Sequence, residues 1–228
     1  MTTLTKKQIN WLDKCTKGRW TLNSKTGLVD VEGSFDCRGQ RLKGFKGVKF
    51  GVVNRYFWCE NNRLTSLVGA PQEVGGSFDC SNNSLTSLVG APLKVGESFD
   101  CDNNRLTSLV GAPQTVGWSF ACSYNALTSL EGAPLKVGND FYCGNNRLTS
   151  LEGAPQEVGE SFYCNNNPVS WATLYAIFSK MEEGHSFVIA SARLRNEMSE
   201  KDWRLISPNI PEAIRPGVNM LARFGVFK

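Results

Sequence analysis

The sequence predicts a solenoid built on a parallel β-sheet, because a few residue types recur at a constant interval over most of its 228 residues. Seven cysteines are 22 residues apart once and 21 apart thereafter: Cys37, Cys59, Cys80, Cys101, Cys122, Cys143 and Cys164. A phenylalanine stands two residues before each of them, and a leucine stands five residues after the first six. Such self-similarity indicates equivalent turns that stack on one another.

Aligned on cysteine, the repeat reads V-G-x-S-F-x-C-x-x-N-x-L-T-S-L-x-G-A-P-x-x. The Phe and Cys of F-x-C lie two residues apart, so both side chains should point to the core face of a short strand. The asparagine, replaced by Gln40 in the first repeat, is expected to bind backbone groups where the strand ends, in its own turn and the neighbouring one. The G-A-P triplet disfavours a helical return.

The repeat follows the leucine-rich-repeat pattern L-x-L-x-x-N-x-L, with Phe and Cys in the two strand positions. The phrase "LTSLEGAPLKVGNDFYCGNNRLTSLEGAP" resembles leucine-rich repeats encoded by bacteriophages and, more distantly, the repeats of secreted bacterial effectors of the E3-ligase type. The segment "RWTLNSKTGLVDVEGSFDC" resembles the N-terminal cap of the phage group. The resemblance covers roughly residues 18 to 170 and implies a leucine-rich-repeat solenoid of about seven 21–22-residue repeats. Its parallel sheet would lie on the concave side, and its convex side would be mostly non-helical.

A solenoid exposes its core at both ends, so caps are expected there. The predicted division is an N-terminal cap over 1–33, the solenoid over 34–168 and a C-terminal α-helical cap over 169–228. Residues 5–15 should form a helix with Ile9, Leu12 and Cys15 on one face. An amphipathic helix is expected in "SWATLYAIFSKMEEG", and "SFVIASARLRNEM" and the segments after it suggest further short helices.

The cysteine column does not indicate a chemical site. Stacked strands would place the thiols in single file, whereas a zinc site needs converging ligands, and the chain has no C-x-x-C motif and His185 as its only histidine. Cysteines in a parallel, in-register ladder point the same way, which disfavours disulfides. We therefore expect buried thiols, and neither a metal nor a cofactor.

The sequence also argues against an enzyme. No Ser-His-Asp set forms around a single histidine, no glycine-rich loop precedes a helix, and no cysteine follows Cys164, where the ligase domain of the resembled effectors would lie. No apolar run approaches the ~18 residues of a membrane span, and the start has no hydrophobic signal region. The expected location is the cytoplasm, which would be that of the bacterial host for a phage protein.

Residues beside Phe and Cys should face outward, and these columns vary while the core columns repeat. One set is acidic: Glu60, Asp79, Glu97, Asp100 and Asp102. A second set is aromatic: Trp118, Tyr124, Tyr142 and Tyr163, with Trp58 in the same outward column as the two tyrosines. Exposed Trp and Tyr are typical interface residues, and the acids suit a basic partner surface. Two other interpretations stay open: solvated acids and common strand formers, or, for the acids, a calcium site.

Charge is unevenly distributed along the chain. Residues 1–59 hold twelve Lys/Arg and four Asp/Glu, whereas residues 60–165 hold five and eleven. Six basic residues crowd one stretch: Arg38, Arg41, Lys43, Lys46, Lys49 and Arg55. Aromatic residues lie among them, a pattern that could bind nucleic acid or a nucleotide, although Phe45, Phe50 and Phe57 are needed for the core. The leading hypothesis is a module that binds a host protein and inhibits a host enzyme or an anti-phage defence component, and nucleic-acid binding is the alternative.

Overall fold

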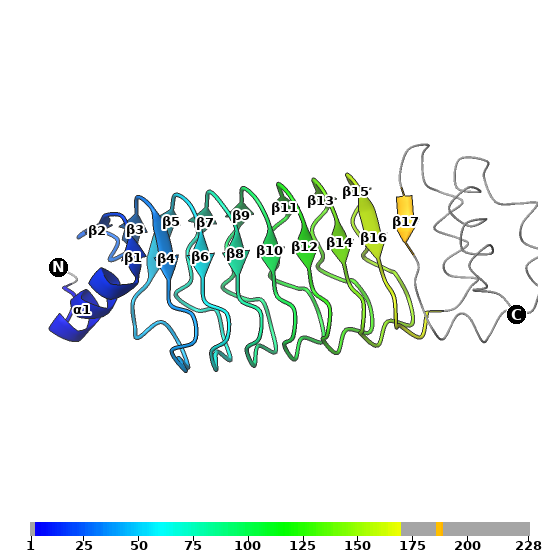
Figure 1. Cartoon of the computed structure of the whole chain (residues 1–228), viewed down its shortest axis with the longest axis horizontal. Helices are drawn as coiled ribbons and strands as arrows, with labels where there is room; N and C mark the ends of the chain where they lie inside the picture. Colours follow the sequence, from blue (N-terminus) through cyan, green and yellow to red (C-terminus); the bar gives the residue numbers. More distant parts are fainter. Residues whose placement is uncertain (1–2, 170–185, 189–228) are drawn as a thin grey trace, which may run out of the picture.

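The computed structural model of the chain describes residues 3–169 and 186–188. Through residues 34–169 the chain winds into a solenoid whose turns stack side by side along the longest axis of the molecule (Figure 1). Within that stretch there is no α-helix, and each repeat contributes one short strand to each of two sheets. The predicted parallel solenoid with a 21-residue repeat is thereby confirmed.

The two sheets are named after their buried residues. The Phe-strand sheet has, in spatial order, β1 (Thr16–Lys17), β4 (Ser34–Asp36), β6 (Phe57–Trp58), β8 (Phe78–Asp79), β10 (Phe99–Asp100), β12 (Phe120–Ala121), β14 (Phe141–Tyr142), β16 (Ser161–Tyr163) and β17 (Ser186–Val188). The Val-strand sheet has β2 (Trp20–Leu22), β3 (Val29–Val31), β5 (Phe50–Val53), β7 (Glu73–Val74), β9 (Lys94–Val95), β11 (Thr115–Val116), β13 (Lys136–Val137) and β15 (Glu157–Val158). All pairs are parallel except β1 with β4 and β2 with β3.

The core consists of columns of identical side chains. In the Phe-strand sheet each phenylalanine pairs in register with that of the next turn, as Phe78 does with Phe99. From Phe57 to Phe162 consecutive rings stack with centroids 5.0 to 5.5 Å apart. The leucine and valine columns are buried with them. Each turn therefore completes the core of its neighbours, and no turn has a core of its own.

The cysteine column is buried, as predicted, and all eight cysteines are free. Burial raises the pKa of these thiols, as at Cys80 and Cys101, so they remain protonated. From Cys59 to Cys122 each thiol donates to a backbone carbonyl of the next turn, at 3.1 to 3.3 Å. The thiols thus add weak hydrogen bonds between turns to their packing, a contact that the sequence pattern did not reveal.

The asparagine column joins adjacent turns, which confirms its predicted role. The Asn104 amide donates to the carbonyls of Cys101 and Asp102 in its own turn and of Cys80 in the preceding turn, at 3.1 to 3.2 Å. Its Oδ1 accepts from the backbone N–H of Leu85 at 2.9 Å. Gln40, at the first place of the column, instead bonds to Trp11 and Cys15 and so attaches the N-terminal cap.

The Val-strand sheet was not anticipated from the sequence, although it repeats as regularly as the Phe-strand sheet. Its strands are mostly two residues long, and a glycine follows each from β7 onward. A Cβ at Gly117 would overlap the carbonyl oxygen of Gly96 in the preceding turn. Glycine is therefore required there by the close approach of two backbones, and not by a positive φ.

The N-terminal cap contains α1 (Lys6–Cys15), with Thr5 and Gln8 forming a capping box. Its buried residues are Trp11, Leu12 and Cys15. The expectation that Ile9 belongs to the buried face was wrong, because Ile9 is 37% exposed and the Trp11 ring packs against Phe35 and Phe50 instead.

At the other end, β17 pairs in parallel with β16 and extends the Phe-strand sheet by one strand. Residues 186–188 were expected to begin a helix, and this was wrong because a β-forming segment pairs with the backbone edge that β16 offers. The helix expected in "SWATLYAIFSKMEEG" and those after residue 188 lie outside the described residues. In the described part of the chain, no helix has the length and apolar content to cross a membrane.

Replacing Asn104 by alanine should lower the free energy of unfolding by about 2–4 kcal/mol, because buried backbone groups of two turns lose their partners. Urea denaturation measures this. Asn103→Gly is the matched control, since Asn103 is exposed at φ 54° and glycine adopts that conformation readily. Equal losses for the two variants would contradict the bridging role.

Candidate protein-binding surface

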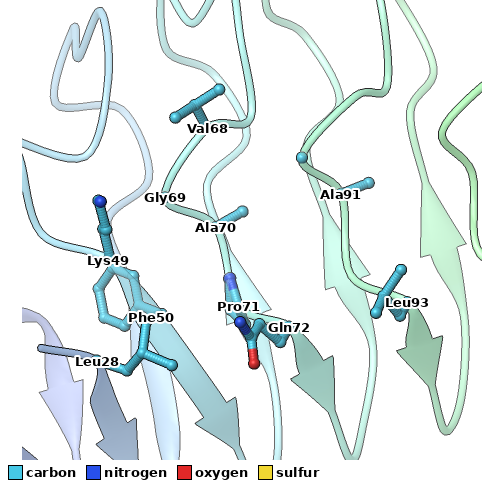
Figure 2. A pocket seen from close by; sticks show the side chains of 11 residues that line it. Leu28, Lys49, Phe50, Val68, Gly69, Ala70, Pro71, Gln72, Ala91 and Leu93 are labelled. Atoms are coloured by element: carbon cyan, nitrogen blue, oxygen red, sulfur yellow. The ribbon is translucent and has the colours of Figure 1, made fainter. Parts of the chain in front are cut away.

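An apolar cleft lies beside the start of the Val-strand sheet and opens between neighbouring G-A-P segments (Figure 2). It has a volume of about 280 Å³, and its walls include Phe50, Ala70 and Leu93. Leu93 and Val68 are 78% and 68% exposed. Lys49 is the one charged residue of its lining, so the cleft offers no converging polar groups for a specific small ligand.

The outward side chains of the Phe-strand sheet form a continuous row across the turns. Strand pairing places Asp36, Trp58, Asp79, Asp100, Ala121, Tyr142 and Tyr163 next to one another in that order. Each is partly exposed, whereas the adjacent Phe and Cys residues are buried. The row therefore has an acidic half and a tyrosine half, and Ala121, its smallest side chain, separates them.

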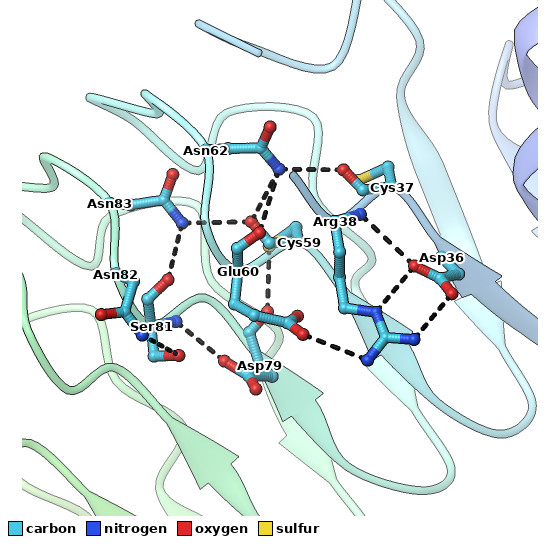
Figure 3. Close-up of polar contacts among 10 residues, drawn as sticks. All are labelled: Asp36, Cys37, Arg38, Cys59, Glu60, Asn62, Asp79, Ser81, Asn82 and Asn83. Carbon is cyan, nitrogen blue, oxygen red and sulfur yellow. Dashed lines mark hydrogen bonds and ion pairs between the residues drawn. The ribbon is translucent and has the colours of Figure 1, made fainter. Parts of the chain in front are cut away.

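At the start of the row, one arginine bridges two carboxylates (Figure 3). The Arg38 guanidinium donates to both oxygens of Asp36 at 2.9 Å and lies 3.4 Å from Glu60 of the next turn. It also lies over the Trp58 ring, 4.8 Å from its centroid. The Trp58 ring also stacks on Tyr56. Trp58, which the sequence suggested as a binding residue, thus already contacts two side chains of its own chain.

Asp79 and Asp100 of the row, and Asp102 two residues after Asp100, have no basic partner among the described residues. Burial, and then the nearby Asp102 and Asp79, raise the pKa of Asp100 to about 7. Burial also raises the pKa of Asp102 to about 6, with a smaller contribution from Asp79. These carboxylates therefore destabilise the folded chain when they are ionised.

Glu60, on the same surface, has a buried carboxylate oxygen that accepts no hydrogen bond. The residue is 8% exposed and its Oε2 has no hydrogen-bond partner. Burial raises the pKa of its carboxyl, and Asp79 contributes to the rise. Figure 3 shows the Glu60 carboxylate between Arg38 and Asp79. A buried carboxylate oxygen without a donor is costly, so the arrangement around Glu60 reduces the stability of the fold.

Two exposed aromatic residues flank β12. Trp118 lies before the strand and is 60% exposed, and Tyr124 lies after it and is 56% exposed. The Tyr124 backbone is left-handed, with φ 55°. The same place in the turns from β6 to β16 is otherwise asparagine: Asn61, Asn82, Asn103, Asn145 and Asn166. Asparagine tolerates this conformation better than tyrosine does, so Tyr124 is present at a cost in stability.

Tyr142 and Tyr163 form a stacked pair, with centroids 4.7 Å apart and rings inclined by 5°. The Tyr142 hydroxyl donates to Asp140 at 2.9 Å. Burial, and then this bond, raise the pKa of Tyr142 to about 12, so it stays neutral. The pair thus offers a preorganised aromatic surface next to Ala121. Asp140, which orients it, was not among the residues singled out from the sequence.

The basic end is less available for phosphate binding than its sequence suggested. Phe45, Phe50 and Phe57 are buried in the core, as expected. Arg38 is held by Asp36 and Glu60, and the Lys46 ammonium lies 5.0 Å from the centroid of the Trp11 ring. Of the six basic residues in this stretch, four are exposed and have no such partner described: Arg41, Lys43, Lys49 and Arg55.

The acids do not converge as metal ligands do. Over residues 3–169, no group of three or more His, Cys, Asp or Glu side chains is placed to hold a metal ion. The acidic row runs along the sheet across several turns, which suits an extended, positively charged surface better than a single ion.

Comparisons of the chain with protein-family models, curated proteins and solved structures find no match.

Replacing Asp100 by asparagine should stabilise the fold at about pH 8 and have little effect at about pH 4. The folded pKa of about 7 lies above the ordinary value of 3.8, so stability from this group is present at low pH and is lost as pH rises from about 4 to 7. Since one pKa unit corresponds to about 1.4 kcal/mol, we expect a gain of at least about 1 kcal/mol at pH 8. Urea denaturation across pH measures it. Glu131→Gln, an equal charge change at an exposed residue, should give no such pH-dependent gain.

Replacing Tyr124 by asparagine should raise the free energy of unfolding by about 0.5–1 kcal/mol, because it relieves the left-handed strain. The reciprocal change, Asn61→Tyr at φ 56°, should lower it by a similar amount. Thermal or urea denaturation of both variants tests the point. A destabilised Tyr124→Asn variant would show that Tyr124 makes stabilising contacts instead.

Proposed function

We propose that the chain is a non-enzymatic protein-binding module whose partner binds the exposed face of the Phe-strand sheet. The observation that carries this proposal is Tyr124, an exposed aromatic residue with a left-handed backbone. The other turns from β6 to β16 have asparagine at this place. Strain retained at an exposed position indicates a role other than folding. Trp118 at the other end of β12 and the Tyr142–Tyr163 stack add further aromatic anchors.

The acids on this face specify the kind of partner. Asp79, Asp100 and Asp102 lie on neighbouring turns and, among the described residues, form no ion pair with Lys or Arg, so they would attract a basic surface and slow its dissociation once they are paired. The resemblance of the repeats to phage-encoded ones supports a bacterial host protein in the host cytoplasm as the partner. Binding would block a host enzyme or an anti-phage defence component.

A nucleic-acid site at the basic end is the competing function, favoured by the exposed Arg41, Lys43, Lys49 and Arg55. It receives less support because Arg38 and Lys46 already have partners within the chain. Binding to single-stranded DNA or RNA that falls steeply with salt and disappears in an Arg41→Gln/Lys43→Gln variant would favour this function over the first.

The double variant Trp118→Glu/Tyr124→Asn should lose at least about tenfold of the partner captured from a bacterial lysate, because it removes two interface anchors. Both replacements are residues that other turns carry at the same places, for example Glu97 and Asn103, so the fold should be kept. Quantitative mass spectrometry of the captured proteins measures the loss.

Leu135→Gln is the control for that experiment. Leu135 is 49% exposed and lies on a connecting segment, and Gln114 and Gln156 occupy its place in the adjacent turns. This variant removes a comparable exposed apolar side chain away from the Phe-strand face, and it should capture the partner as the wild type does. Equal capture by all three proteins would exclude the Trp118–Tyr124 surface as the binding site.

A further inference from the structure

A row of exposed side chains runs along the segments that lead into the Val-strand sheet. Five consecutive turns carry, at the place before G-A-P, Val68, Val89, Val110, Glu131 and Glu152. Neighbouring turns touch at this place, because a Cβ at Gly111 would overlap the backbone of Val89 in the preceding turn. The five residues, which we call the G-A-P row, therefore lie side by side, with three apolar residues followed by two acidic ones.

The apolar part of the G-A-P row is open to solvent. Val68, Val89 and Val110 are 68%, 59% and 51% exposed. The fold does not require valine there, since later turns carry glutamate at the same place. Leu93, in the same segment as Val89, is 78% exposed and lines the apolar cleft together with Val68 (Figure 2). A contiguous exposed apolar surface beside a cleft is typical of a protein interface.

The charges at the two ends of the row have opposite signs. Lys49, which lines the cleft, is exposed in the segment one turn before Val68. Glu131 and Glu152 are exposed at the other end. Within the described residues, none of these three charged side chains forms an ion pair. Lys49 and Glu131 are four turns, or roughly 19 Å, apart, so they cannot pair within one chain.

We infer that the G-A-P row joins two copies of this chain, whose valines pack together in antiparallel order about a two-fold axis at Val89. Val68 of each copy then lies against Val110 of the other, and Leu93 lies near its own symmetry mate. One self-complementary surface is sufficient for such a contact, and two-fold dimers are the commonest homo-oligomers. Association removes from water the apolar side chains that a single copy leaves exposed.

Charge complementarity selects a second copy as the occupant of this surface. The axis at Val89 brings Lys49, two turns before it, opposite Glu131, two turns after it, and it does so twice in each dimer. Lys94, near the axis, lies on β9 beside Glu73 of β7, which offsets its charge within each copy. The row lies on connecting segments, so a dimer keeps both Phe-strand faces open. The inference therefore goes beyond the proposed function and does not depend on it.

Sedimentation equilibrium of the full chain between about 1 and 500 µM tests the inference. We expect a reversible monomer–dimer equilibrium with a Kd of about 10–100 µM, since the apolar contact is small. Val89→Glu should weaken dimerisation at least about tenfold, because it places two like charges at the axis. Glutamate stands at this place in two other turns, so the variant should fold, and thermal denaturation of the dilute protein checks this.

A charge exchange tests the antiparallel orientation. Lys49→Glu and Glu131→Lys should each weaken the dimer about tenfold, because each sets like charges against one another at two contacts. The combined Lys49→Glu/Glu131→Lys variant should restore the Kd of the wild type. A parallel dimer would set each residue against its own symmetry mate, and the combined variant would then not recover. Trp118→Glu/Tyr124→Asn, on the Phe-strand face, is the control and should dimerise as the wild type does.

Four results would overturn the inference: a monomer at every concentration up to about 500 µM, an undiminished dimer in Val89→Glu, an equal loss in the Trp118→Glu/Tyr124→Asn variant, or no recovery in the combined charge exchange. A row covered by another part of the same chain would give the first of these results. The dimer is measured without the partner protein, so its failure is distinguishable from failure of the proposed function.

Discussion

The backbone hydrogen bonds between consecutive turns impose the constraint on which the rest of the structure depends. Every turn must meet its neighbour with carbonyls at the same places, so the N–H of Cys80 donates to the carbonyl of Asp100 in the next turn, and the N–H of Cys101 donates to that of Ala121. The asparagine amides continue this pairing past the ends of the strands, where the ladder would otherwise stop. Because the two sheets run side by side, a shift of one turn by a single residue would break both ladders and the phenylalanine stack together.

This constraint separates positions that must repeat from positions that are open to variation. Phe, Cys, Asn, Leu, Val and the glycine of each turn face a neighbour of the same kind, and a change in one turn affects the turns on both sides. At outward positions only the backbone takes part in the pairing between turns, and the side chain is free to differ. Residues as unlike as Asp100, Ala121 and Tyr142 can therefore lie next to one another. Departures from the repeat at outward positions are free to serve binding, and some of them reduce stability. Tyr124 does so through its backbone conformation, and Asp100 does so through the burial of its charge.

Much of the fold could be predicted from the sequence, since the Phe, Cys and Asn columns define one strand and its register. The Val-strand sheet was missed because a two-residue strand such as Glu73–Val74 has too little alternation to be recognised, although its buried valine recurs in every turn. The buried face of α1 was assigned to Ile9 by helical spacing, but contact with Phe35 and Phe50 selects Trp11. Such a choice depends on the surface that the helix meets, which its own sequence does not contain.

The candidate surface was predicted in outline, because the register alone places Asp79, Asp100, Tyr142 and Tyr163 on one face. The contacts between side chains within this surface were not predicted. Arg38 was counted with the basic residues near it in sequence, but it belongs with Asp36 and with Glu60, which lies 22 residues away in the next turn. Trp58 looked open and is in contact with Arg38 and Tyr56. Side-chain pairing across turns depends on reach and rotamer as well as on register, so it became visible only in the structure.

The most direct test of the division between repeating core and variable surface is the unfolding free energy of a chain whose outward residues are exchanged between turns. Exchanging Asp79 with Tyr142 keeps the composition, the core columns and the asparagines unchanged. The free energy of unfolding from urea denaturation should stay within about 1 kcal/mol of that of the natural chain. A loss of several kcal/mol would contradict the account, because it would show that the order of the outward residues is needed to build the fold.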